Sequence, residues 1–137
     1  MSNQDLLKYP PKILIAFGEA ISNNKEIQDW LLKNDYPELA ALAFSIRGSD
    51  EAFTWLMKNG HLPLAALDSA IDEDQKAYQW LLDNNYASHI VFADACHGKK
   101  EAIEWFLRNS LHPIFRITQV IRKLRDSQTF DYHKLHF

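Results

Sequence analysis

The chain has 137 residues, which is the size of a single domain and long enough to bury a substantial core. Hydrophobic residues make up 47% of the sequence, and this excludes a mostly disordered chain. Residues 1–111 carry 10 Lys and Arg against 16 Asp and Glu, a net charge of −6, whereas residues 112–137 carry 5 against 2, a net of +3. An acidic body argues against general nucleic-acid binding.

The N-terminal stretch MSNQDLLKYPPKILIAF lacks the basic start and long apolar run of a signal peptide. No apolar stretch approaches the ~18 residues that a membrane span needs. The single cysteine, Cys96, cannot form an internal disulfide. We therefore expect a soluble cytoplasmic protein with no membrane partner. Within residues 1–11, Leu6-Leu7-Lys8 is in register with Leu31-Leu32-Lys33, which predicts an N-terminal cap.

From residue 12 the chain repeats every 25 residues without gaps, and we number the positions of each repeat 1 to 25. Its four tryptophans all occupy position 19. A period of this length is typical of arrays of small structural units. The four repeats are residues 12–36 (KILIAFGEAISNNKEIQDWLLKNDY), 37–61 (PELAALAFSIRGSDEAFTWLMKNGH), 62–86 (LPLAALDSAIDEDQKAYQWLLDNNY) and 87–111 (ASHIVFADACHGKKEAIEWFLRNSL).

The residue pattern of each repeat predicts two short helices. Apolar residues at positions 3, 6 and 10 form one helical stripe, and a polar break follows. A second stripe begins three residues before each tryptophan and continues through two apolar residues after it. An asparagine and then a residue suited to a left-handed turn end this second helix. Prolines near the start of the next helix fit the first helical turn, where a missing N–H is harmless.

The tryptophans, Trp30, Trp55, Trp80 and Trp105, are predicted to form a ladder in the core, each packed between its own first helix and the neighbouring repeat. The period continues past residue 111. Ile114, Ile117 and Ile121 occupy positions 3, 6 and 10, and Phe130 falls at the tryptophan position. Residues 112–137 are therefore predicted to be a degenerate fifth repeat that caps the array. The expected fold is all-α: an α-solenoid of four to five stacked helix-turn-helix repeats in one domain, residues 1–137.

The segments SIRGSDEAFTWLMKNG and ACHGKKEAIEWFLRNS carry a resemblance to ankyrin repeats. Gly48 and Gly98 fall where ankyrin units place the glycine between helices, and Glu51 and Glu101 follow at the usual acidic position. The units are about eight residues shorter than the ankyrin repeat, roughly the length of its β-hairpin. They also lack its Thr-Pro-Leu-His start. The resemblance implies protein binding on a concave face, without hairpin fingertips.

No catalytic or metal-binding motif is present. Cys96 precedes His97 but occupies the isoleucine position of the apolar stripe, which predicts a buried structural thiol. The acidic run Asp72-Glu73-Asp74 lacks Ca²⁺-loop spacing and is interpreted as turn and helix-start charge. We predict no enzyme activity, no cofactor and no metal, although an active site assembled from scattered residues in the groove of the solenoid stays open.

Position 8 is the most variable position of the otherwise apolar first helices. If this column faces outward, it would select a partner protein or peptide, and Phe44 would be an aromatic anchor. The alternative is that helical drift half-buries it. The predicted partner-binding residues are Glu19, Phe44, Ser69, Asp94 and Gln119.

The basic C-terminal end gives a second functional hypothesis. Its cations could contact a phosphate backbone, an acidic partner or a neighbouring subunit, or could simply be a solvated cap helix. The predicted basic patch is Arg116, Arg122, Lys123 and Arg125. The leading expectation is a non-enzymatic module that binds a protein or peptide on the first-helix face. The alternative is a nucleic-acid or phosphate-binding accessory protein, and the sequence does not indicate an oligomeric state.

Overall fold

The computed structural model describes residues 6–127, and every regular element within them is a helix. The all-α class is therefore confirmed for this part of the chain. The elements in chain order are η1 (Leu6–Lys8), α1 (Pro11–Ile21), α2 (Lys25–Lys33), α3 (Pro37–Ile46), α4 (Asp50–Lys58), α5 (Leu62–Ile71), α6 (Gln75–Asp83), α7 (Ala87–Cys96), α8 (Lys100–Arg108) and α9 (His112–Ser127).

The predicted turns lie where the repeat places them. We call α1, α3, α5, α7 and α9 the first helices, and α2, α4, α6 and α8 the second helices. Proline occupies the first or second position of α1, α3 and α5. Three second helices begin after a side-chain cap, in which Asn24, Ser49 or Asp74 accepts a hydrogen bond from a backbone N–H.

An asparagine ends each second helix, as predicted, and its side chain makes a hydrogen bond that the sequence pattern did not predict. Asn34 itself has a negative φ, and its side-chain amide donates to the carbonyl of Trp30 at 2.8 Å. The same bond recurs in the other three repeats, and each tryptophan carbonyl also accepts from the backbone N–H of the same asparagine, so every asparagine makes two hydrogen bonds to the last turn of its helix. The left-handed residue is the next one in each repeat: Asp35, Gly60, Asn85 and Ser110.

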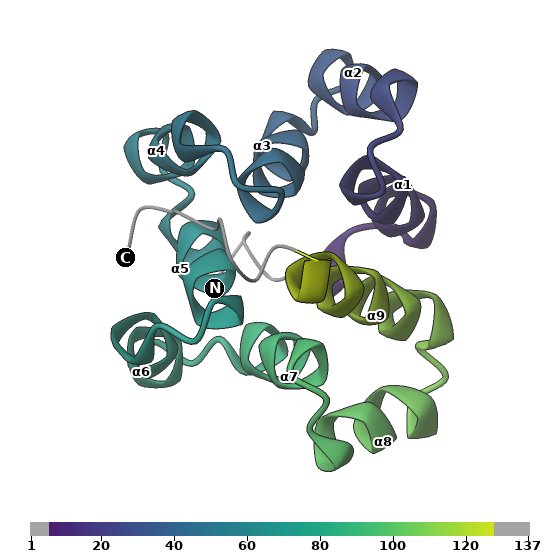
Figure 1. The fold of residues 1–137 in the computed structure, drawn as a ribbon, viewed down its shortest axis with the longest axis vertical. Coiled ribbons are helices and arrows are strands. Elements are labelled where there is room, and N and C mark those ends of the chain that lie inside the picture. The colour runs from purple at the N-terminus through teal and green to yellow at the C-terminus, as the bar shows by residue number, and fades with distance from the viewer. Residues whose placement is uncertain (1–5, 128–137) are drawn as a thin grey trace.

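The first helices form a closed ring, with the second helices around its outside (Figure 1). Contacts run from α1 to α3, α5, α7 and α9 in order, and α9 packs back against α1. The prediction of stacked helix pairs did not anticipate this contact between the first and last helices. α9 is also longer than the others, at 16 residues. The predicted second half of the fifth repeat, including Phe130, lies outside the described residues.

The core lies between the two layers of helices. Position 6 of the first helices supplies Phe17, Leu42, Leu67 and Phe92, all fully buried, and Ile117 at 4% exposure. Position 20 of the second helices supplies a residue from each repeat that is also fully buried. These four are Leu31, Leu56, Leu81 and Phe106.

The prediction that the tryptophans are core rungs is wrong. Trp30 and Trp55 are 43% and 36% exposed, and the other two are half-buried. Successive helical residues point about 100° apart, so position 20 faces the core while position 19 points sideways. Each of the first three tryptophans stacks on the ring at position 25, such as Tyr36 or His61, and so covers the turn that ends its helix.

Residues before α1 reach across the ring. Leu6 is fully buried and η1 packs against α7, while the Tyr9 hydroxyl donates to Glu38 of α3 at 2.7 Å. Burial and this hydrogen bond raise the pKa of Tyr9. The described part of the predicted N-terminal cap therefore contacts two repeats that are distant from it in sequence.

Candidate functional site

The five residues of position 8 do not form one exposed row. Glu19 is exposed, while Phe44, Asp94 and Gln119 are half-buried. Ser69 is only 2% exposed, in a helix that is buried from Pro63 to Ile71, and it cannot serve as a partner contact. The structure places Phe44 in one groove and brings Glu19 and Gln119 together in another.

Asp94 is occupied by contacts within the chain. The Tyr78 hydroxyl donates to its carboxylate at 3.0 Å, and the Lys99 ammonium lies 3.3 Å from it. Burial and then the hydrogen bond to Asp94 raise the pKa of Tyr78, and the same carboxylate raises the pKa of Lys99. Tyr78 and Lys99 also border a cavity of about 320 Å³ beside the turn after α5. The contacts with Tyr78 and Lys99 stabilise the junction of α6 and α7.

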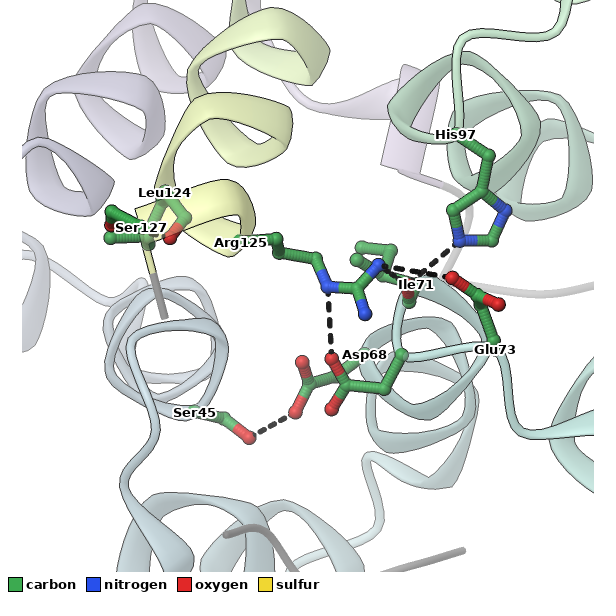
Figure 2. Close-up of polar contacts among 9 residues, drawn as sticks. Ser45, Asp68, Ile71, Glu73, His97, Leu124, Arg125 and Ser127 are labelled. Atoms are coloured by element: carbon green, nitrogen blue, oxygen red, sulfur yellow. Dashed lines mark hydrogen bonds and ion pairs between the residues drawn. The ribbon is translucent and has the colours of Figure 1, made fainter. Parts of the chain in front are cut away.

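The basic end does not present one continuous surface. Figure 2 shows Arg125 reaching from α9 to the C-terminal end of α5, where it donates to the Ile71 carbonyl. Its guanidinium Nε also lies 3.3 Å from the Asp72 carboxylate. His97 contacts the same carbonyl at 2.7 Å. The Arg122 guanidinium lies against Gly98, and Arg116 lines a groove on the far side of α9. Arg125 therefore makes contacts within the chain and is not part of an exposed basic patch.

A groove on the outside of the ring contains the apolar side chains best placed to meet a partner. It lies between α2 and α4, with α3 as its floor, and has a volume of about 330 Å³. Leu32 and Trp55 form its walls and are 48% and 36% exposed, and Phe44 lies between them. We call this the outer groove, lined by Leu32, Pro37, Ala41, Phe44, Ser49, Glu51, Ala52 and Trp55.

Leu32 occupies position 21, which the sequence pattern placed in the apolar stripe of the second helix. Position 21 carries an apolar residue in all four repeats, and each is 39–48% exposed. The signal was available in the sequence, because positions 20 and 21 are adjacent and cannot both face the same core. Only the first residue after each tryptophan is buried. The exposed column is Leu32, Met57, Leu82 and Leu107.

Other chemistry has little support in the described structure. Within residues 6–127, no three His, Cys, Asp or Glu side chains gather where they would hold a metal ion. Cys96 is buried, and burial raises the pKa of its thiol, which disfavours the reactive thiolate. None of the helices in the described range combines the length and apolar character needed to cross a lipid bilayer.

In comparison with known proteins, no family model, curated protein or solved structure matches the chain. The resemblance to ankyrin repeats therefore stays a prediction. The candidate site depends on the geometry of the outer groove alone.

Proposed function

We propose that this protein is a non-enzymatic interaction module that binds a segment of a partner protein in the outer groove. The observation that carries the proposal is that the exposed side chains of Leu32 and Trp55, from α2 and α4, line one groove together with Phe44. Apolar side chains held in a cleft by a rigid scaffold are the usual anchors of protein interfaces. Glu51 at the edge of the groove adds one acidic contact.

The repeated helix pairs support this proposal because they form a scaffold of a type that commonly binds other proteins. Repeated helix-turn-helix units, stacked in the manner of a solenoid and similar to ankyrin units, provide a fixed scaffold on which surface residues vary. The proposed surface differs from the concave face that the resemblance implies, since the first-helix column is only partly accessible. The ligand is a short peptide segment with a leucine or an aromatic residue that fills the space above Phe44.

The chain offers a matched control for the test. Leu32 and Leu82 both occupy position 21, and their exposures are 48% and 47%, but only Leu32 lines the outer groove. Proteins captured from native lysate by wild type should be lost with Leu32→Asp and retained with Leu82→Asp. A captured partner, once purified, should bind Phe44→Ala about tenfold more weakly, since truncation of an interface aromatic typically costs more than 1 kcal/mol.

Two results would count against the proposal. Equal capture by wild type and Leu32→Asp would show that the outer groove is not the binding surface. Equal loss with both aspartate variants would show a general effect of charge on the outer helices rather than a site. Circular dichroism and thermal unfolding of all variants establish that each one is folded.

A further inference from the structure

Four of the five junctions in the ring are covered by a second helix. α2 packs on both α1 and α3, α4 on α3 and α5, α6 on α5 and α7, and α8 on α7 and α9. The fifth junction lies between α9 and α1, and no helix of the described residues bridges it (Figure 1). Every other first-helix pair therefore has a cover that this pair lacks.

Residues 125–127, the first of the repeat positions that would supply the cover, belong to α9. In register, the fifth second helix would begin near residue 125, after a turn at residues 122–124. Instead α9 continues without a turn to Ser127. Arg125, at the first of these positions, is directed to Ile71 and Asp72 of the opposite repeat (Figure 2). The start of the expected fifth second helix is thus part of α9.

The uncovered junction is an apolar groove of about 400 Å³. Ile15 in this groove is 49% exposed, whereas at the same repeat position Ala40 and Ala65 are fully buried and Ile90 is half-buried. Two charged side chains of opposite sign, Glu19 and Arg116, lie exposed in its lining. We call this groove the closing seam, lined by Ile15, Gly18, Glu19, Ser22, Pro113, Arg116, Ile117, Gln119 and Val120.

The second helices of this chain show what shape fits such a junction. Each is nine residues long, and each buries the residue at position 20 completely. A helix of this length spans about 14 Å. An occupant of the closing seam therefore needs one leucine or phenylalanine facing inward and a small or apolar residue about one turn before it. An acidic residue toward Arg116 and a basic residue toward Glu19 would complete the match.

We propose that the closing seam is the docking site for an amphipathic helix of a partner protein, which takes the place of the fifth second helix. The recognition chemistry is that of a helix in an apolar groove, with both edges charged. This site is separate from the outer groove and does not depend on the proposed function there.

The test uses a peptide whose sequence is already adapted to such a junction. A fluorescein-labelled peptide of residues 24–36, NKEIQDWLLKNDY, is titrated with the full chain and followed by fluorescence anisotropy. A short free helix is marginal in water, so we expect a dissociation constant on the order of 100 µM. The same peptide with Leu31→Asp should not bind, because it loses the residue that every second helix buries.

Variants of the protein locate the binding. Ile15→Glu should weaken the affinity for the peptide by about tenfold or more, because it places a charge beneath the docked helix. Leu82→Glu, with nearly the same exposure at 47%, and Leu32→Glu in the outer groove should change it less than about twofold. Because Leu32→Glu tests the outer groove, failure at one site is distinguishable from failure at the other.

Four results would overturn the proposal. The first is no rise in peptide anisotropy at about 1 mM protein. The second is an equal loss with Ile15→Glu and Leu82→Glu. A gain of about tenfold on truncation after Ser127 would assign the closing seam to residues 128–137 of this chain. Finally, a dimer in sedimentation that becomes a monomer with Ile15→Glu would assign it to a second copy.

Discussion

On every second helix, a tryptophan and the residue after it lie in different environments. Leu56 is fully buried in the core, while the adjacent Trp55 is 36% exposed and stacks on His61 with ring centroids 5.4 Å apart. The tryptophan is the larger apolar residue, yet much of its area stays in water. Its contribution to folding therefore comes from covering a turn, and the smaller leucine contributes more to the core.

This difference predicts an unusual order of stability changes. Leu56→Ala should lower the free energy of unfolding by about 2–5 kcal/mol, since it leaves a cavity in the core. Trp55→Ala should lower it by about 1 kcal/mol, because it removes one stacked pair and only partly buried area. Urea unfolding followed by circular dichroism measures both. A larger loss of unfolding free energy for Trp55→Ala than for Leu56→Ala would show that the tryptophans are the main core residues after all.

At the scale of elements, donor side chains on one repeat cap the C-terminal carbonyls of the preceding one. Arg47 donates to the Ile21 carbonyl at 2.7 Å, and His97 contacts the Ile71 carbonyl at the same distance. Both occupy position 11, just after a first helix, and both interact favourably with the negative end of the neighbouring helix. Position 11 of the third repeat is Asp72, which cannot donate a hydrogen bond as a carboxylate.

Arg125 pairs with this carboxylate. It extends from α9 to Asp72 and to the Ile71 carbonyl, which His97 also contacts, so one guanidinium meets both the acidic side chain and the end of α5 (Figure 2). Its side chain is 24% exposed, and the Asp72 side chain is 10% exposed. A pair so little exposed is screened less by solvent than a surface ion pair.

We predict that Arg125→Ala lowers the free energy of unfolding by about 1–3 kcal/mol, because it leaves a partly buried carboxylate without this contact. Lys123→Ala, an exposed cation two residues earlier on the same helix, should change it by less than about 0.5 kcal/mol. Chemical denaturation of both variants beside wild type gives the comparison. Indistinguishable values for the two would mean that Arg125 belongs to the surface, as the basic-patch hypothesis had it.

At the scale of the whole molecule, the 25-residue period made the helices and turns predictable because both depend on local residue types. The asparagine column and the left-handed residues after it are examples. Closure of the ring was not predictable in this way, since it depends on the angle between successive repeats. That angle is set by how the side chains of neighbouring helices pack, which the period alone does not specify.

In the candidate site, too, features that depend on local residue types were predictable, and features that depend on packing between repeats were not. Phe44 was predictable as a candidate anchor because an aromatic residue stands out in a variable column. Its neighbours in the outer groove, Leu32 and Trp55, come from two different repeats, and the sequence does not show that they line one groove. Ser69 shares its column with Phe44 and is nevertheless buried, as is all of α5 from Pro63 to Ile71.

Gly18 is the residue on which ring closure depends most directly. It lies inside α1, where a glycine is less favourable than alanine by about 1 kcal/mol. A Cβ atom at this position would lie 2.9 Å from Cγ1 of Ile117 on α9, closer than packed carbon atoms allow. The absence of a side chain is thus what lets α1 and α9 approach, and the ring closes at the expense of local helix stability.

A double-mutant cycle separates these two effects. Gly18→Ala alone should lower the free energy of unfolding by about 1 kcal/mol, because overpacking against Ile117 outweighs the gain in helix propensity. In an Ile117→Ala background the same substitution should raise it by about 1 kcal/mol, since the obstructing side chain is gone. Urea denaturation gives the four free energies, and small-angle X-ray scattering reports whether the single variant widens the ring. A stabilising effect of Gly18→Ala in both backgrounds would mean that α1 and α9 are not closely packed in solution and that the ring is open.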